Sequence, residues 1–121
     1  TDKYFKSMAQ AILVSDKVIE EEPQLVQAFV RATLKGLKDI VDDPESATVD
    51  YINAVPGYQG REEYISRVFA LYNKLVYAGQ SPLGKIDAER LSDLQDFYVK
   101  EGIVNKKTPL EDLYTNAFIP E

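Results

Sequence analysis

Prolines that stand directly before runs of apolar residues at helical spacing constrain the fold of this chain more than any other feature. After Pro23, apolar residues recur at steps of three and four as far as Val41, the spacing that one face of an α-helix requires. Proline fits the first turn of a helix, where its missing N–H group has no partner to lose, and it ends a helix that precedes it. Pro44 and Pro109 stand in the same position before further repeats. We therefore expect a succession of separate helices.

The complete pattern predicts six helices, two of them short. Ser15 is a suitable N-cap for the first helix, Asp43 for the third and Asp87 for the fifth. Gly102 followed by Ile103 fits a Schellman ending of the fifth. The segment 108–111 has the composition of a capping box with proline at the first helical position. The helices are expected at about residues 16–21, 23–42, 44–55, 61–77, 88–101 and 109–119.

Gly36 and the segment Ala11–Val14 depart from this pattern. Glycine within a helix costs about 1 kcal/mol relative to alanine, so we expect Gly36 to allow a close contact with another helix. The segment Ala11–Val14 is short, apolar and partly β-branched, and Gln10 and Ser15 bound it with polar side chains. It predicts one buried strand, with a buried helix start as the alternative. The predicted fold class is therefore mainly α, with about six helices and one short strand.

Size and composition indicate one folded domain. The 121 residues fit a single domain, residues 1–121, and 45% of them are hydrophobic and 28% charged, as in globular proteins. No apolar run is long enough for a transmembrane helix or a signal peptide. The net charge of −6 repels phosphate backbones, so we expect no nucleic-acid partner, and solubility is the simplest interpretation of this charge. The chain starts with Thr1 instead of Met, and we expect a processed chain or a fragment.

The residue types on which most enzymes rely are scarce in this sequence. It contains no Cys and no His, which removes thiolate nucleophiles, imidazole bases and the common zinc ligands. The acidic runs Glu20–Glu22 and Asp42–Asp43 fall at helix ends or on solvated faces, where carboxylates act as surface charges. The glycines are too scattered for a phosphate-binding loop. We expect neither catalysis, nor a metal site, nor a cofactor.

Two segments remain as candidates for contact with a ligand. Tyr4–Ser7 combines aromatic and polar side chains directly before the predicted strand. Ser81–Asp87 contains Gly84 and leads into a helix N-terminus, whose free N–H groups and positive dipole end suit an anion. Ordinary chain packing and an ordinary connecting loop are the respective alternatives.

Two longer stretches resemble a known family of binding proteins. The stretch ILVSDKVIEEEPQLVQAFVRATLKGLKDIVDDPESATVDYI is similar to the segment after the last crossover between lobes in ABC-importer solute-binding proteins for nitrate, sulfonates, taurine and thiamine-type pyrimidine precursors. The stretch SPLGKIDAERLSDLQDFYVKEGIVNKKTPLEDLYTNAFI is similar to the carboxy-terminal end of the same proteins. Many relatives carry an aromatic residue after the loop glycine, whereas Lys85 follows Gly84 here. The resemblance extends over nearly all the chain from about Ala11.

The resemblance implies a two-lobed α/β fold of the periplasmic-binding-protein type, of which this chain supplies the later, helix-rich part of one lobe. It implies that a small solute is bound by hinge closure of the lobes and delivered to an ABC permease. It also implies export, to the periplasm or to the outer face of the cytoplasmic membrane. Within such a fold, Tyr4 and Phe5 lie near the hinge and are the candidate ligand-binding residues. The remainder of the chain is expected to be scaffold.

Two other functions are consistent with the sequence. A branch of the same fold synthesises the thiamine pyrimidine with an essential His and iron, and this chain has no His to supply. The second alternative is a free-standing helical interaction domain whose helices line an apolar groove. Part of a lobe that is separated from its remainder exposes surfaces meant to be covered, so a homodimer of the chain is a further expectation.

Overall fold

The computed structural model describes residues 7, 8 and 10–120, and the regular structure of this part of the chain is helical. No residue in it belongs to a strand, so the mainly α prediction is confirmed. Short turns of 3-10 helix occur at η1 (Pro56–Tyr58) and η3 (Leu110–Asp112), and η2 (Asn73–Tyr77) is π-helical. The α-helices are α1 (Asp16–Glu21), α2 (Pro23–Asp42), α3 (Pro44–Ala54), α4 (Glu62–Tyr72) and α5 (Ala88–Lys100).

Polar caps begin the first helices, as the sequence predicts. Ser15 Oγ accepts a hydrogen bond from the Val18 N–H group at the start of α1. Asp43 follows α2 and caps α3, because its carboxylate accepts the Ser46 N–H group at 3.0 Å. Each cap satisfies an N–H group that has no partner within its own helix. A single residue is therefore enough to separate α2 from α3.

The predicted ending of α5 is also confirmed. Gly102 has a φ of 68°, in the left-handed region that glycine adopts without strain. The Gly102 N–H group bonds to the Val99 carbonyl at 3.1 Å, and the Ile103 N–H group bonds to the Tyr98 carbonyl at 2.8 Å. These are the two hydrogen bonds of the Schellman motif, and they satisfy carbonyls that the helix itself leaves without donors.

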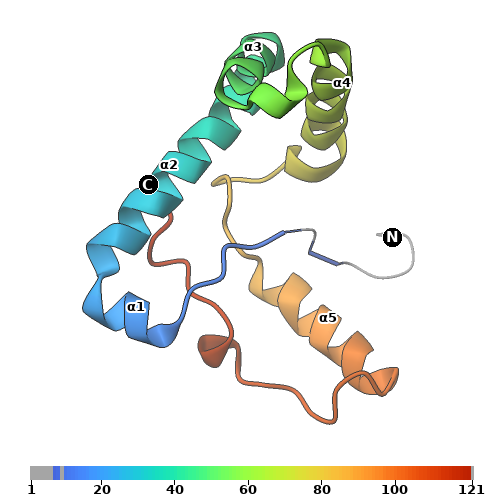
Figure 1. Cartoon of the computed structure of the whole chain (residues 1–121). Coiled ribbons are helices and arrows are strands. Elements are labelled where there is room, and N and C mark those ends of the chain that lie inside the picture. Colours follow the sequence, from blue (N-terminus) through green and yellow to red (C-terminus); the bar gives the residue numbers. More distant parts are fainter. Residues whose placement is uncertain (1–6, 9, 121) are drawn as a thin grey trace.

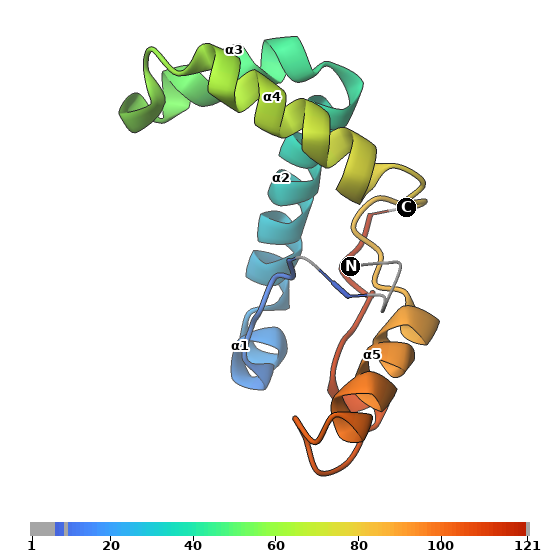
Figure 2. The ribbon, with the colours of Figure 1, turned by 90° about the vertical axis from the view of Figure 1, so that its right-hand side faces the viewer.

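The helices form an open arrangement around α2. In Figure 1, α3 and α4 lie across the far end of this long helix, and α5 lies apart from it, beside its other half. The view in Figure 2, turned by 90°, agrees, and in both views the carboxy-terminal segment runs between α2 and α5. The chain thus has one part in which helices pack directly on one another and one part in which a helix stands off from the rest.

The core lies where α2, α3 and α4 meet. Tyr51 of α3 and Phe69 of α4 pack edge to face with their ring centroids 5.7 Å apart, a favourable geometry for aromatic rings. The Thr48 hydroxyl, buried in α3, donates to the Pro44 carbonyl at 2.7 Å, so its burial leaves no donor unsatisfied. Among the described residues, the buried apolar side chains are Val26, Val30, Ala47, Ile52 and Ile65.

The strand predicted for Ala11–Val14 is not formed. These residues precede α1 without regular structure, and the Leu13 side chain is 90% exposed. A strand exists only when its N–H and carbonyl groups pair with a neighbouring strand, and the residues that the structure describes offer none. The segment has the composition of a buried strand but lacks the sheet that would bury it.

The expected helix contact at Gly36 is also wrong. A side-chain carbon built at this glycine meets no atom within 4 Å. α2 packs through the face that carries Val26 and Val30, the two α2 residues that are buried, and Gly36 lies on a different face. The glycine therefore has no packing role among the described residues.

Two predicted helices differ in their ends. The helix expected at 61–77 changes from α to π geometry at Asn73. The helix expected at 109–119 is reduced to the single turn η3, because the predicted capping box does not form. In a capping box the Glu111 side chain would accept the Thr108 N–H group. Gln95 of α5 accepts it instead, at 2.7 Å.

Candidate functional site

The loop between η2 and α5 is the point at which distant parts of the chain meet. Gly84, near its middle, has a φ of 82°, and its backbone lies directly against α2. A side-chain carbon at this position would overlap Leu34 Cδ2. The backbone angle favours glycine here, and a larger residue would also displace the end of the Leu34 side chain. The close contact fixes the loop on the side of α2 that carries Leu34.

Asn116 joins the carboxy-terminal segment to the same loop. Its side-chain oxygen accepts the Ile86 N–H group at 2.9 Å, and its side-chain nitrogen donates to the Ile86 carbonyl at 3.0 Å. One amide side chain thus satisfies both backbone groups of a residue that has no helix or strand partner. The loop is held between α2 on one side and the carboxy-terminal segment on the other.

Arg90 of α5 brings the amino-terminal segment to this junction. Its Nε donates to the Ser7 carbonyl at 3.0 Å, and its Nη2 donates to the same oxygen. The two segments selected from the sequence, residues 4–7 and 81–87, therefore approach each other through Ser7 and the first turn of α5. Tyr4 and Phe5 lie outside the described residues, and their placement near a ligand stays a prediction.

The helix N-terminus that follows the loop is already occupied by a carboxylate. Asp87 Oδ1 accepts the N–H groups of Glu89 and Arg90 at 2.9 and 3.1 Å. The dipole end that was expected to suit an anion thus carries the charge of Asp87 and, in the first turn, that of Glu89. A second anion would be repelled here, so the alternative of a connecting loop fits this geometry better. The Lys85 side chain is exposed.

A pocket of about 310 Å³ opens beside the same loop. At its base, Asn73 Nδ2 donates to the Ile40 carbonyl of α2 at 2.7 Å, which ties the π-helical segment to α2. Asn73 Oδ1 is buried and has no hydrogen-bond partner within the described part of the chain. Burial raises the pKa of the Tyr77 phenol above its ordinary value of 10.0, and the neighbouring Tyr72 raises it further. The pocket is lined by Lys38, Val41, Asp42, Asn73, Tyr77, Ala78, Gly79, Gln80 and Leu83.

The side chains that line this pocket are suited to bind a molecule through hydrogen bonds. The Lys38 ammonium donates to the Asp42 carboxylate, so this cation and this anion largely neutralise each other. The phenol of Tyr77 and the buried Asn73 oxygen can hydrogen-bond to a neutral polar molecule. Over residues 7, 8 and 10–120 there is no group of three or more metal-binding side chains and no helix long and apolar enough to cross a bilayer.

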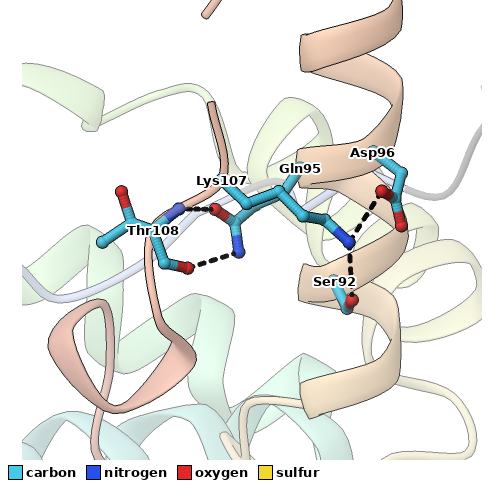
Figure 3. Close-up of polar contacts among 5 residues, drawn as sticks. All are labelled: Ser92, Gln95, Asp96, Lys107 and Thr108. Atoms are coloured by element: carbon cyan, nitrogen blue, oxygen red, sulfur yellow. Dashed lines mark hydrogen bonds and ion pairs between the residues drawn. The ribbon is translucent and has the colours of Figure 1, made fainter. Parts of the chain in front are cut away.

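Side chains of α5 also hold the segment that follows it (Figure 3). Gln95 accepts the Thr108 N–H group and donates to the Thr108 carbonyl at 3.1 Å. Lys107 lies 2.6 Å from a carboxylate oxygen of Asp96 and 3.4 Å from the hydroxyl oxygen of Ser92. No local pattern in the sequence indicates Arg90, Gln95 or Asn116, because each bonds to a backbone group far away in the chain.

Comparisons with known proteins agree with the resemblance stated above. Residues 3–47 match the family described as NMT1/THI5 like. The riboflavin-binding protein RibY of Chloroflexus aurantiacus is 28% identical in an alignment that covers 96% of this chain and 34% of RibY. The chain thus spans about a third of the length of this curated relative. No solved structure matches the chain. The similarity to a solute-binding family, first indicated by the helical stretch after Ala11, is confirmed.

Proposed function

We propose that this chain, which is similar to NMT1/THI5-like proteins, forms part of a solute-binding protein that captures a small molecule for import. The observation that carries this proposal is the similarity to a riboflavin-binding protein along 96% of the chain. The match extends well past residues 3–47, so it includes the loop at Gly84 and the segment at Asn116. A helical scaffold without His or Cys agrees with a binding role.

Riboflavin is the first solute to test, because RibY is named for binding it. A flavin is flat, aromatic and rich in hydrogen-bonding groups, and it is bound by stacking on aromatic side chains together with a few polar contacts. Tyr4 and Phe5, which lie inside the matched residues 3–47, could supply such stacking. Nitrate, sulfonates, taurine and pyrimidine precursors, which the sequence resemblance implied, are the next solutes to test.

Delivery of the solute to an ABC permease completes the proposed role. The protein would act outside the cytoplasmic membrane, in the periplasm or anchored to the outer face of the membrane. The lobes would close on the solute about a hinge, and the permease would recognise the closed form. Within this cycle, α2 to α4 serve as a rigid scaffold, the loop at Gly84 packs on α2, and Arg90 of α5 holds the amino-terminal segment at the Ser7 carbonyl.

The THI5 part of the family description favours one alternative, a pyrimidine synthase. That reaction needs a His, which this chain does not contain. The synthase would therefore require a His from another part of a longer protein. Detection of bound iron, or of a pyrimidine product, in the protein as it occurs in the cell would favour this alternative over transport.

Titration of riboflavin with the purified full-length protein tests the proposal. Stacking on an aromatic ring quenches flavin fluorescence, so we expect saturable quenching. Substitution of Tyr4→Ala together with Phe5→Ala should weaken binding, and Tyr114→Ala, in the carboxy-terminal segment, is the matched aromatic control. Calorimetric titration with nitrate, taurine and a sulfonate extends the search. If none of these solutes binds to the full-length protein, the transport proposal fails.

A further inference from the structure

Arg90 of α5 holds the backbone of a segment that lies 83 residues earlier in the chain. Its guanidinium donates from both Nε and Nη2 to one oxygen, the Ser7 carbonyl, and the contact is partly buried. Ser7 and Met8 are half-buried although they belong to no helix or strand. A hydrogen bond from a charged donor is about twice as strong as one from a neutral donor. Arg90 therefore fixes a piece of backbone that no regular structure holds.

The backbone of Arg90 is itself fixed at the start of α5. Its N–H group donates to Asp87 Oδ1 at 3.1 Å, as part of the cap of this helix. Ile86, the residue before Asp87, is held by Asn116 through both of its backbone groups. The Arg90 side chain thus starts from a well-defined position. A contact made from such a position loses little conformational freedom when it forms, so it can determine where the segment that it holds will lie.

The segment that Arg90 holds leads directly to the candidate ligand-binding residues. Phe5 precedes Ser7 by two positions in the sequence, and Tyr4 precedes it by three. Each residue adds at most about 3.6 Å to the reach of a chain, so an anchor at Ser7 limits the positions that are open to both aromatic side chains. A binding group is effective only when it is held within about 0.5 Å of its productive position. The anchor and the two aromatic residues are therefore expected to act together.

We propose that Arg90 is a positioning residue for the solute, which sets the affinity by holding the segment that carries Tyr4 and Phe5. Its guanidinium bonds to the Ser7 backbone and not to the solute. Without this contact the segment would have to be ordered when the solute binds, and the entropy lost at that moment would reduce the affinity. The inference rests on the proposed function, because it requires that the two aromatic residues bind a solute.

The geometry of the contact predicts how substitutions of Arg90 rank. The planar guanidinium places two N–H groups on the same carbonyl oxygen, whereas lysine offers one compact ammonium on a flexible stem. Arg90→Lys should therefore retain the charge and part of the contact. Arg90→Met removes every donor, and because Met forms helices about as well as Arg, α5 should remain helical. The predicted order of affinity for the solute is Arg, then Lys, then Met.

Hydrogen exchange of the full-length protein without solute tests the first step, the anchoring of the segment. Arg90→Met should speed the exchange of backbone N–H groups in the peptide that contains residues 4–8, because local opening becomes easier when the anchor is lost. Arg67→Met is the matched control, since Arg67 is exposed on α4 in the helical body, and it should leave this peptide unchanged. Equal exchange in Arg90→Met and in the unchanged protein would overturn the proposal.

A double-mutant cycle with riboflavin tests the second step, the effect on affinity. In the full-length protein, Arg90→Met should raise Kd about tenfold, which corresponds to ordering one or two more side chains when the solute binds. Arg90→Lys should raise Kd less, and Arg67→Met should not change it. When Tyr4→Ala and Phe5→Ala are already present, Arg90→Met should add little, because residues that act as a unit are not additive. Circular dichroism should show equal helix content, and Arg90→Lys takes the place of Arg90→Met in the cycle if that variant does not fold.

The outcomes separate this inference from the proposed function. An equal rise of Kd with and without the two aromatic side chains would show that Arg90 acts on the solute itself or on the fold as a whole, and would overturn the inference alone. An unchanged Kd in Arg90→Met would do the same. If the unchanged protein binds neither riboflavin nor the other solutes named above, the proposed function fails, and the role of Arg90 in solute binding fails with it.

Discussion

The two halves of this molecule are held together by different forces. The helical body, α2 to α4, contains all the apolar side chains that are buried in the described part of the chain. The carboxy-terminal arm, α5 with residues 101–120, has none of them and is fixed by side chains that bond to backbone groups. Both halves have amphipathic helices. The comparison shows that an apolar stripe predicts a helix but does not determine how deeply that helix is buried.

Chain connectivity explains the difference. One residue, Asp43, joins α2 to α3, and a short turn through η1 joins α3 to α4, so these helices pack as sequence neighbours. The arm follows the loop that contains Gly84, and Arg90 and Gln95 of α5 bond to the backbone of other segments. Hydrogen bonds of this kind contribute about 1 kcal/mol each, which is less than burial of a large side chain in a core.

The largest loss of stability should come from Ile65→Ala in the helical body. The Ile65 side chain is 4% exposed, and truncation of such a residue destabilises a protein by about 2–5 kcal/mol. Leu94→Ala in the arm removes a side chain of similar size that is only half-buried, so we expect about 1 kcal/mol. Urea unfolding followed by circular dichroism measures both. Equal losses of stability at the two positions would contradict the distinction between body and arm.

The next largest loss of stability is expected from a substitution in the loop that joins the two halves. Gly84→Ala forces a side chain into the left-handed region, which costs about 1–2 kcal/mol, and it also displaces Leu34 from its position. Gly79→Ala is the matched control, because Gly79 has a similar φ of 83° with no atom near its missing side chain. Gly84→Ala should therefore lower the free energy of unfolding more than Gly79→Ala. Equal effects would mean that contact with α2 does not stabilise the loop.

Local signals in the sequence predict most of the helices and their ends. The sequence does not predict contacts between residues that are far apart in the chain. The Asp43 cap and the Gly102 ending depend on neighbouring residues, and both are confirmed. The strand at Ala11–Val14 failed because a strand needs a partner, and no sequence pattern says whether one is present. The candidate site shows the same limit. Arg90, which bonds to Ser7, and Asn116, which bonds to Ile86, act on distant backbone groups, and no local pattern predicted either of them.

Removal of the hydrogen bonds that hold the arm should cause intermediate losses of stability. Asn116→Ala removes both contacts to Ile86, which is half-buried, and leaves its backbone groups without partners, so we expect a loss of about 1–3 kcal/mol. Gln95→Ala removes two contacts to Thr108, which is exposed, and water can replace them, so we expect about 0.5–1 kcal/mol. Hydrogen exchange measured along the arm would locate the effects. A larger loss for Gln95→Ala would contradict the role assigned to burial.

A smaller effect is expected for the ion pair between Lys107 and Asp96. Their side chains are 42% and 64% exposed, and exposed pairs contribute about 0–1 kcal/mol. Lys107→Ala should therefore change the free energy of unfolding by less than Gln95→Ala does. The difference from the unchanged chain should shrink when the salt concentration rises, because salt screens exposed charges. A loss that is independent of salt would assign the effect to the Ser92 contact or to packing.

The smallest effect is a loss of stability at alkaline pH. It is expected from Tyr77 in η2, which directly follows the helical body. Burial raises the pKa of Tyr77 above 10.0 in the folded chain, and Tyr72 adds to the shift. The folded state then holds the phenol proton more tightly than the unfolded state, so the contribution of Tyr77 is complete below pH 10.0 and is lost as the pH rises through the folded pKa. Urea unfolding of the unchanged chain and of Tyr77→Phe across this range isolates this one phenol from the other tyrosines. Stability of the unchanged chain should fall more steeply than that of Tyr77→Phe above pH 10.0, and parallel profiles would show that the folded pocket does not hold the phenol away from water.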